Sequence, residues 1–143
     1  MKKLAENLWV IQQPFKYLGL SVGTRMTIIR LENQELLIVS PIELTEEIKA
    51  QVDRLGIVKH LVLPNLFHYL FADKWGETYP ESITYAVSNL QKKRPQLTID
   101  KFLDSQENFW HSELNYLPFT GVNTLTPGGI FPLEEYVFYH SGK

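Results

Sequence analysis

Short apolar runs separated by polar spacers dominate the first part of the chain, and this pattern is typical of strands in a sheet. The runs 25–31 and 36–41 flank the polar spacer "ENQE" and predict a β-hairpin. The run 36–41 is almost continuously apolar, which indicates a central strand covered on both faces. Residues 8–15 predict an earlier strand, and we expect Pro14 to end it.

One segment carries a clear helical pattern. Ile48, Val52 and Leu55 recur at helical spacing within residues 44–56. Thr45 can cap the N-terminus of this helix, because its hydroxyl can accept from a free backbone N–H of the first turn. The sequence therefore predicts a helix that follows directly on the hairpin.

The run 57–65 predicts another buried strand, ended by Pro64. A strand, helix and strand of these lengths predict a parallel crossover, and α/β folds place ligands at the carboxyl ends of such strands. Asn65 and His68 follow the strand and are candidate binding residues, and Arg25 is a candidate for binding an anion. The structural alternatives are a turn for Asn65, a helix cap for His68 and a salt bridge for Arg25.

The second half of the chain is less regular. The segment 96–120 has a mixed pattern that favours no element. The remaining patterns predict, in order, a helix within 68–79, a strand at 82–87, a short helix at 88–95, a turn at 126–129 and a strand at 134–140.

Composition narrows the classes of function. The chain has 143 residues, 44% of them apolar, a net charge of −2 and no cysteine. The absence of a basic field disfavours nucleic-acid binding, and the absence of thiols excludes disulfides and thiolate nucleophiles. No apolar run approaches the roughly 18 residues of a membrane helix, and the N-terminus is too polar for a signal peptide. We therefore expect a soluble cytoplasmic protein with no membrane partner.

Four stretches occur in a characteristic order: "YLGLSVGTRMTIIRL", "LLIVSP", "LGIVKHLVLPNLFH" and "EEYVFYH". Together they resemble a family of uncharacterised proteins, a domain of unknown function placed at the edge of the metallo-β-lactamase superfamily. The resemblance implies an α/β (α+β) fold, an αββα sandwich of which this chain is the N-terminal part only. Residues 1–143 would then form a single incomplete domain, and the chain looks truncated.

The resemblance also identifies where the superfamily carries its metal motif, His-x-His-x-Asp-His, directly after the buried strand. In this chain Asn65 and Phe67 stand at the positions of the first two histidines, and Tyr69 and Leu70 replace the Asp–His pair. His68 falls at a variable position of the motif. Because the imidazoles that would aim at one metal are missing, we predict no metal and no cofactor.

The other three histidines offer no local replacement. His60, His111 and His140 are far apart in the sequence, so no pair has the spacing of metal ligands. His60 lies inside an apolar strand, and we expect it to be a hydrogen-bonded core or edge residue.

Three interpretations of function follow. The first is a degenerate, non-catalytic domain that serves as a scaffold or binds a small molecule or a protein. A half sandwich would leave a sheet face or strand edge uncovered, which predicts a homo-oligomer. The alternative is a metal-dependent hydrolase with a non-standard ligand set around Asn65 and His68, so whether the protein is an enzyme stays open. The third is a fragment with no activity of its own.

Overall fold

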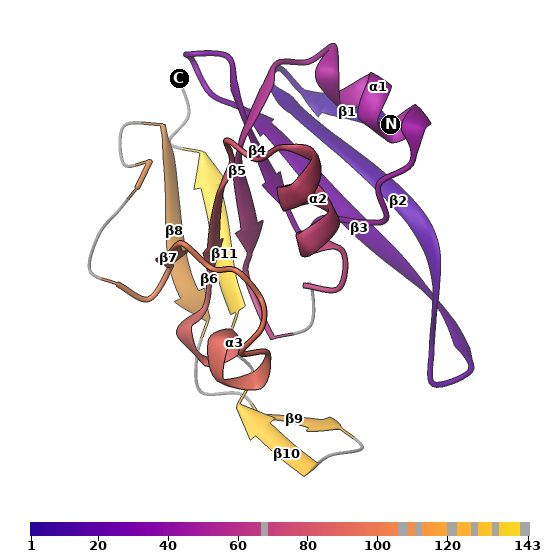
Figure 1. Cartoon of the computed structure of the whole chain (residues 1–143), viewed down its shortest axis with the longest axis vertical. Helices are drawn as coiled ribbons and strands as arrows, with labels where there is room; N and C mark the ends of the chain where they lie inside the picture. Colours follow the sequence, from indigo (N-terminus) through magenta and orange to yellow (C-terminus); the bar gives the residue numbers. More distant parts are fainter. Residues whose placement is uncertain are drawn as a thin grey trace.

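The computed structural model describes residues 1–66, 69–105, 109–110, 113–119, 123–126, 129–132 and 135–140. Its centre is a seven-stranded sheet with the strands in sequence order (Figure 1). The strands of this sheet are β1 (Lys2–Ala5), β2 (Leu8–Tyr17), β3 (Leu20–Arg30), β4 (Glu35–Val39), β5 (Ile57–Leu63), β6 (Ile83–Ala86) and β7 (Lys101–Phe102).

The sheet changes from antiparallel to parallel at β4. Strands β1 to β4 pair antiparallel with their neighbours, whereas β4, β5, β6 and β7 pair in parallel. Helix α1 (Glu46–Asp53) connects β4 to β5, and its first turn is capped by the Thr45 hydroxyl, which accepts from the Ile48 N–H at 3.2 Å. The predicted hairpin, helix and parallel crossover are therefore confirmed.

The strand predicted at residues 8–15 does not end at Pro14, so this prediction is wrong. Strand β2 continues through Pro14, which lies opposite Gly23 of β3, as far as Tyr17. Strand β1 pairs with β2 only as far as Val10, so the outer side of β2 is unpaired at Pro14. A proline is tolerated on such an edge because no neighbouring strand requires its missing N–H.

The two faces of the sheet have different cover. On the helix face, Met26, Ile28 and Ile38 are fully buried in one core with Ile48 of α1 and Trp75. Trp75 belongs to α2 (Ala72–Thr78), and both helices lie on this side of the sheet (Figure 1). The alternate residues of the same strands form the second face of the sheet.

The second face packs against the segment that follows β7. Leu37, Val62 and Tyr85 form a core with Trp110 and Leu114. Leu114 begins β8 (Leu114–Phe119), which pairs antiparallel with β11 (Glu135–His140). The predicted strand at 134–140 is confirmed, and β4 is covered on both faces as predicted.

A β-bulge interrupts the pairing of β4 with β5. Leu36 pairs with Val58, but the next residue, Leu37, pairs with His60, so Lys59 has no partner on β4. Successive side chains of a strand point to opposite faces, and one extra residue reverses this alternation. Val58 therefore belongs to the core of the helix face, whereas His60 contacts residues of the second face.

The remaining elements are short. Helix α3 (Ser88–Lys93) follows β6, and β9 (Asn123–Thr126) pairs antiparallel with β10 (Gly129–Pro132). The central residues of the predicted turn at 126–129 lie outside the described residues. No helix in the described part of the chain combines the length and apolar character needed to cross a membrane.

Candidate functional site

The carboxyl ends of the parallel strands form one edge of the sheet, here called the strand-end edge. Ser40 follows β4, Asn65 follows β5, and Ser88 and Asp104 follow β6 and β7. The Asn65 side chain lies where the sequence predicts it, just beyond a buried strand, and the residue is only 2% exposed. His68, the second predicted residue, lies outside the described residues.

Asp104 holds the beginning of α3. Its Oδ1 accepts from the Ser88 backbone N–H at 3.0 Å, and its Oδ2 accepts a short hydrogen bond from the Ser88 hydroxyl. A carboxylate that accepts from the first residue of a helix satisfies an otherwise unpaired N–H. This carboxylate at the strand-end edge is therefore already used by the protein itself.

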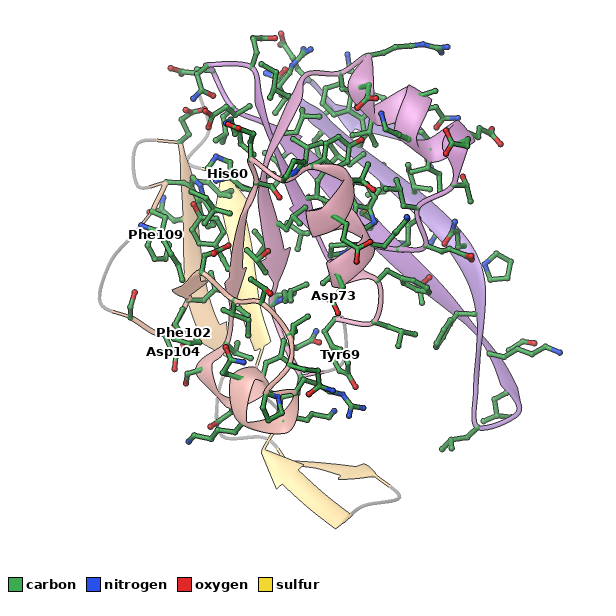
Figure 2. The ribbon with its side chains drawn as sticks, viewed as in Figure 1. His60, Tyr69, Asp73, Phe102, Asp104 and Phe109 are labelled. Atoms are coloured by element: carbon green, nitrogen blue, oxygen red, sulfur yellow. The ribbon has the colours of Figure 1, made fainter. Side chains whose placement is uncertain are left out.

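The basic residues at the end of α3 are also bonded to neighbouring protein atoms. Lys93 Nζ donates to the Leu66 carbonyl at 2.9 Å, and Arg94 Nε donates to the Tyr69 hydroxyl at 2.9 Å. Both cations lie over the Tyr69 ring, at 5.3 and 5.2 Å from its centre. Figure 2 shows Tyr69 and Asp104 on opposite sides of α3. These contacts hold the loop after β5 against α3.

The donor set that the described residues provide at this edge does not fit a zinc ion. Zinc sites in proteins use histidine, cysteine and carboxylate ligands, usually three or four together. Among the described residues no group of three or more such side chains converges. Within the described residues, the strand-end edge offers the hydroxyls of Ser40 and Ser88, the Asn65 amide and the bonded carboxylate of Asp104. At the position of a motif histidine, Leu70 is 59% exposed.

A polar cluster that the sequence does not predict lies on the second face. His60 Nε2 is 2.8 Å from Glu35 Oε2, and His60 Nδ1 is 3.0 Å from the Tyr85 hydroxyl. The Trp110 ring meets the imidazole edge-on. His60 is thus a hydrogen-bonded residue, as predicted, and it lies well away from Asp104 at the strand-end edge (Figure 2).

Burial determines the charge of this histidine. Removal from solvent lowers the pKa of His60 below its ordinary value and outweighs the attraction of Glu35. Partial burial would raise the pKa of Glu35, but hydrogen bonds from His60 and Asn33 lower it overall. At neutral pH, a neutral imidazole therefore donates from Nε2 to the carboxylate and accepts at Nδ1 from Tyr85.

Arg25, the third predicted residue, lies on β3 opposite Gln12 of β2 and is exposed. When the Gln12 amide oxygen faces the guanidinium, it accepts from Nε at 3.3 Å and from Nη2 at 2.9 Å. Among the described residues Arg25 forms no salt bridge, and whether it binds an anion stays a prediction.

Arg25 lines a cleft of about 660 Å³, here called the second-face cleft. The cleft lies along β2 and β3, with Leu114 of β8 on one side. Its lining residues are Leu4, Ala5, Glu6, Asn7, Leu8, Val10, Arg25, Thr27, Ile29, Arg30, Val39 and Leu114. The sequence selects Arg25 but gives no sign of the cleft, because its walls come from distant segments.

The structure does not bring Arg25 and Asn65 into contact. Thr27 pairs with Val39, and Val39 pairs with Val62, so Arg25 and Asn65 lie toward the same end of the sheet. Arg25 lies on β3 and Asn65 follows β5, and β4 runs between these two strands, which places the two backbones about 10 Å apart across the sheet. The predicted residues therefore belong to two places, the strand-end edge and the second-face cleft.

A comparison with models of protein families shows to which family the chain belongs. Residues 5–142 match the family described as Domain of unknown function (DUF4336). The chain belongs to this family. The match confirms the family that the four sequence stretches indicated. A comparison of the DUF4336 chain with curated proteins gave no match.

Solved structures identify the fold of this DUF4336 chain. It is similar to a metallo-β-lactamase from Pontibacter korlensis, with a TM-score of 0.68 and 14% identity over 97% of this chain and 65% of that one. A metallo-β-lactamase from Hirschia baltica gives a TM-score of 0.58 and 12% identity over 80% and 57% of the two chains. The metallo-β-lactamase FIM-1 from Pseudomonas aeruginosa, in its mono-zinc form, gives a TM-score of 0.57 and 14% identity over 80% of this chain and 56% of that one.

These similarities show a partial metallo-β-lactamase-like fold. The chain spans 65% or less of the length of the three structures it matches. Sequence identities this low establish that the folds are similar, but they do not show that this chain shares the activity of those proteins. What the DUF4336 chain does must therefore be argued from its own side chains.

Proposed function

We propose that this chain is a metallo-β-lactamase-like domain that binds a ligand or partner and does not catalyse metal-dependent hydrolysis. The observation that carries the proposal is the use of Asp104 at the strand-end edge. This carboxylate accepts two hydrogen bonds from Ser88 and so holds the start of α3. Asp104 also has no set of partner ligands beside it, because the described residues bring together no group of three or more such side chains and zinc usually needs three or four.

The binding surface of the proposal is the second face. Both edges of the seven-stranded sheet carry lysine: Lys2 and Lys3 on exposed β1, and Lys101 on exposed β7. Lysines on an edge strand discourage pairing with another strand. The second-face cleft, in contrast, has a largely apolar lining that includes the exposed side chain of Leu4. The sheet face is therefore better suited than an edge to bind the proposed ligand or partner.

Zinc binding and turnover test this proposal together. The purified chain is mixed with one equivalent of zinc sulfate and dialysed, and retained zinc is measured by elemental analysis. Hydrolysis of a chromogenic β-lactam is followed in parallel. We expect far less than one zinc per chain, no turnover above buffer, and no change in His68→Ala.

The alternative of a metal-dependent hydrolase with Asn65 and His68 as ligands has one observation in its favour. Asn65 is held almost fully buried at the end of a parallel strand, the place where α/β folds put binding groups. About one zinc per chain, lost in His68→Ala but kept in the matched variant His111→Ala, together with turnover, would replace the proposal with this alternative.

A further inference from the structure

We propose that the second-face cleft binds an amphipathic carboxylate, with its alkyl chain along β2 and β3 and its head group at Arg25. This inference rests on the binding role proposed above and names the chemistry of the ligand. Three observations support it: the shape of the cleft, the hydrogen bonds that its two arginines already make, and the register of the strands that form its floor.

The size and lining of the cleft suit a slender apolar chain. A volume of about 660 Å³ lies within the range of roughly 300–1,000 Å³ found for small-molecule sites. Leu8, Val10 and Ile29 line its floor, and Leu114 closes one side. Val10 is 8% exposed and Leu114 is 1% exposed, so the walls are packed into the protein rather than projecting from it.

The two cations of the lining differ in what they bind. Arg30 Nε donates to Asn7 Oδ1 at 2.9 Å, its Nη1 donates to the Leu55 carbonyl at 3.1 Å, and its guanidinium lies over Trp9. With the Gln12 amide oxygen facing it, Arg25 donates through Nε and Nη2 to this neutral side chain, and no described residue uses its Nη1 donors. Arg25 is therefore the cation available to an anionic head group, and Gln12 holds it in place.

The register separates the polar and apolar ends of the cleft. Gln12 lies opposite Arg25, and Leu8 lies opposite Ile29. Ile29 lies four positions after Arg25, a distance of about 13 Å along an extended strand. Glu6 precedes Leu8 and so lies toward the end of the cleft remote from Arg25. An extended decanoate laid along β3 can then place its carboxylate on Arg25 and its methyl end near Ile29.

A second copy of the chain is the competing occupant of this surface. A flat strand face from another copy would bury the Arg25 guanidinium, and burial of a charge without an opposite charge is costly. A monoanion neutralises Arg25 and fills the concave part with methylene groups. The charge of the lining therefore favours the small anion.

Calorimetric titration of the purified chain with decanoate, below its micelle concentration, tests the proposal. Decyltrimethylammonium has the same alkyl chain and the opposite charge, and we expect it to bind at least tenfold more weakly. Arg25→Gln should weaken decanoate binding about tenfold, the size of one lost charge-assisted hydrogen bond. The matched variant Arg54→Gln, an exposed arginine just after α1, should bind decanoate like the wild type.

The length of the alkyl chain provides an independent readout. Affinity should rise about three- to fourfold for each methylene from hexanoate to decanoate, as expected for apolar burial. Equal binding of the two head groups, unchanged affinity in Arg25→Gln with an unchanged unfolding midpoint, or no dependence on chain length would each overturn the proposal. Concentration-dependent dimers together with absent decanoate binding would assign the surface to a second copy instead.

Failure here is distinct from failure of the proposed function. If decanoate does not bind and the zinc and turnover tests are negative, the ligand class is wrong and the non-catalytic role stands. If the protein retains zinc and turns over substrate, the proposed function is wrong whatever decanoate does.

Discussion

Ile28 and Ile29 are neighbours on β3, yet they lie in contrasting surroundings. Ile28 is fully buried in the core beneath α1 and α2, whereas Ile29 is half-buried and lines the second-face cleft. Successive strand residues point to opposite faces, so the difference reflects what covers each face. On the helix face the cover is continuous over β2, β3 and β4. On the second face the core described here is built on β4, β5 and β6, and β2 and β3 border the second-face cleft.

The two faces also differ in chemistry. The core of the helix face is apolar, and its buried Trp75 donates its indole N–H to the Ile42 carbonyl. The second face holds the His60 cluster and the Arg25 end of the cleft. Polar groups persist in a protein interior when they are hydrogen-bonded, and they give a surface its selectivity. The helix face thus has an apolar core, whereas the second face combines an apolar core with hydrogen-bonded polar groups.

The largest expected effect comes from truncating the two isoleucines. Ile28→Ala removes a fully buried side chain and leaves a cavity, so we expect it to lower the free energy of unfolding by about 2–5 kcal/mol. Ile29→Ala should cost about 1 kcal/mol or less, because water already reaches this side chain. Urea unfolding of both variants measures the difference. Equal losses would mean that the second face is as well covered as the helix face.

A smaller effect is expected from removing one hydroxyl on each side of the sheet. Tyr85→Phe leaves His60 Nδ1 without its hydrogen bond in a largely buried place, which should cost about 1–3 kcal/mol. Tyr79 donates to Asp53 Oδ1 at 2.9 Å near the surface, and Tyr79→Phe should change stability by less than about 0.5 kcal/mol, since water replaces the donor. Thermal unfolding of the two variants compares them, and the reverse ranking would contradict the importance of the His60 cluster.

The smallest expected effect is a pH dependence of the free energy of unfolding that arises from His60 on the second face. The pKa of His60 is lower in the folded protein than in the unfolded chain, where it is about 6.5. The unfolded state therefore binds more protons, and stability falls as pH drops below about 6.5, by at most about 1.4 kcal/mol per pH unit. The lowered pKa values of Glu35 and Asp53 act in the same direction, but at more acidic pH.

Unfolding measurements between pH 7.5 and 5 compare the wild type with His60→Gln. We expect the variant to be less stable at neutral pH and to show a flatter slope in this range. An unchanged slope would show that His60 is not the group that titrates.

The central part of the fold is predictable from the sequence because local signals agree there. Thr45, the helical spacing of Ile48 and Val52, and two continuous apolar runs all indicate β4, α1 and β5, and the structure has them. The path of β2 through Pro14 is not predictable in the same way, since it depends on where the neighbouring β1 ends. Strand β1 itself is short and fully exposed, so it carries no hydrophobic pattern.

The candidate sites are predictable only in part, for a related reason. The position of Asn65 follows from the buried run before it, because a strand end is a local feature. The pairing of Arg25 with Gln12 depends on the register of the hairpin between β2 and β3, and the meeting of His60 with Glu35 and Tyr85 joins residues 25 positions away on either side. Such contacts are set by tertiary structure, which short sequence windows do not contain.

Because of the bulge at Lys59, the face on which each later side chain of β5 lies depends on the number of residues before it and not on their type. Replacing Lys59 by another residue leaves the count unchanged, so every later side chain keeps its side of the sheet. Deleting it would exchange the sides of Leu61 and Val62 and turn His60 away from Glu35. The presence of one extra residue therefore decides on which face of the sheet the His60 imidazole lies.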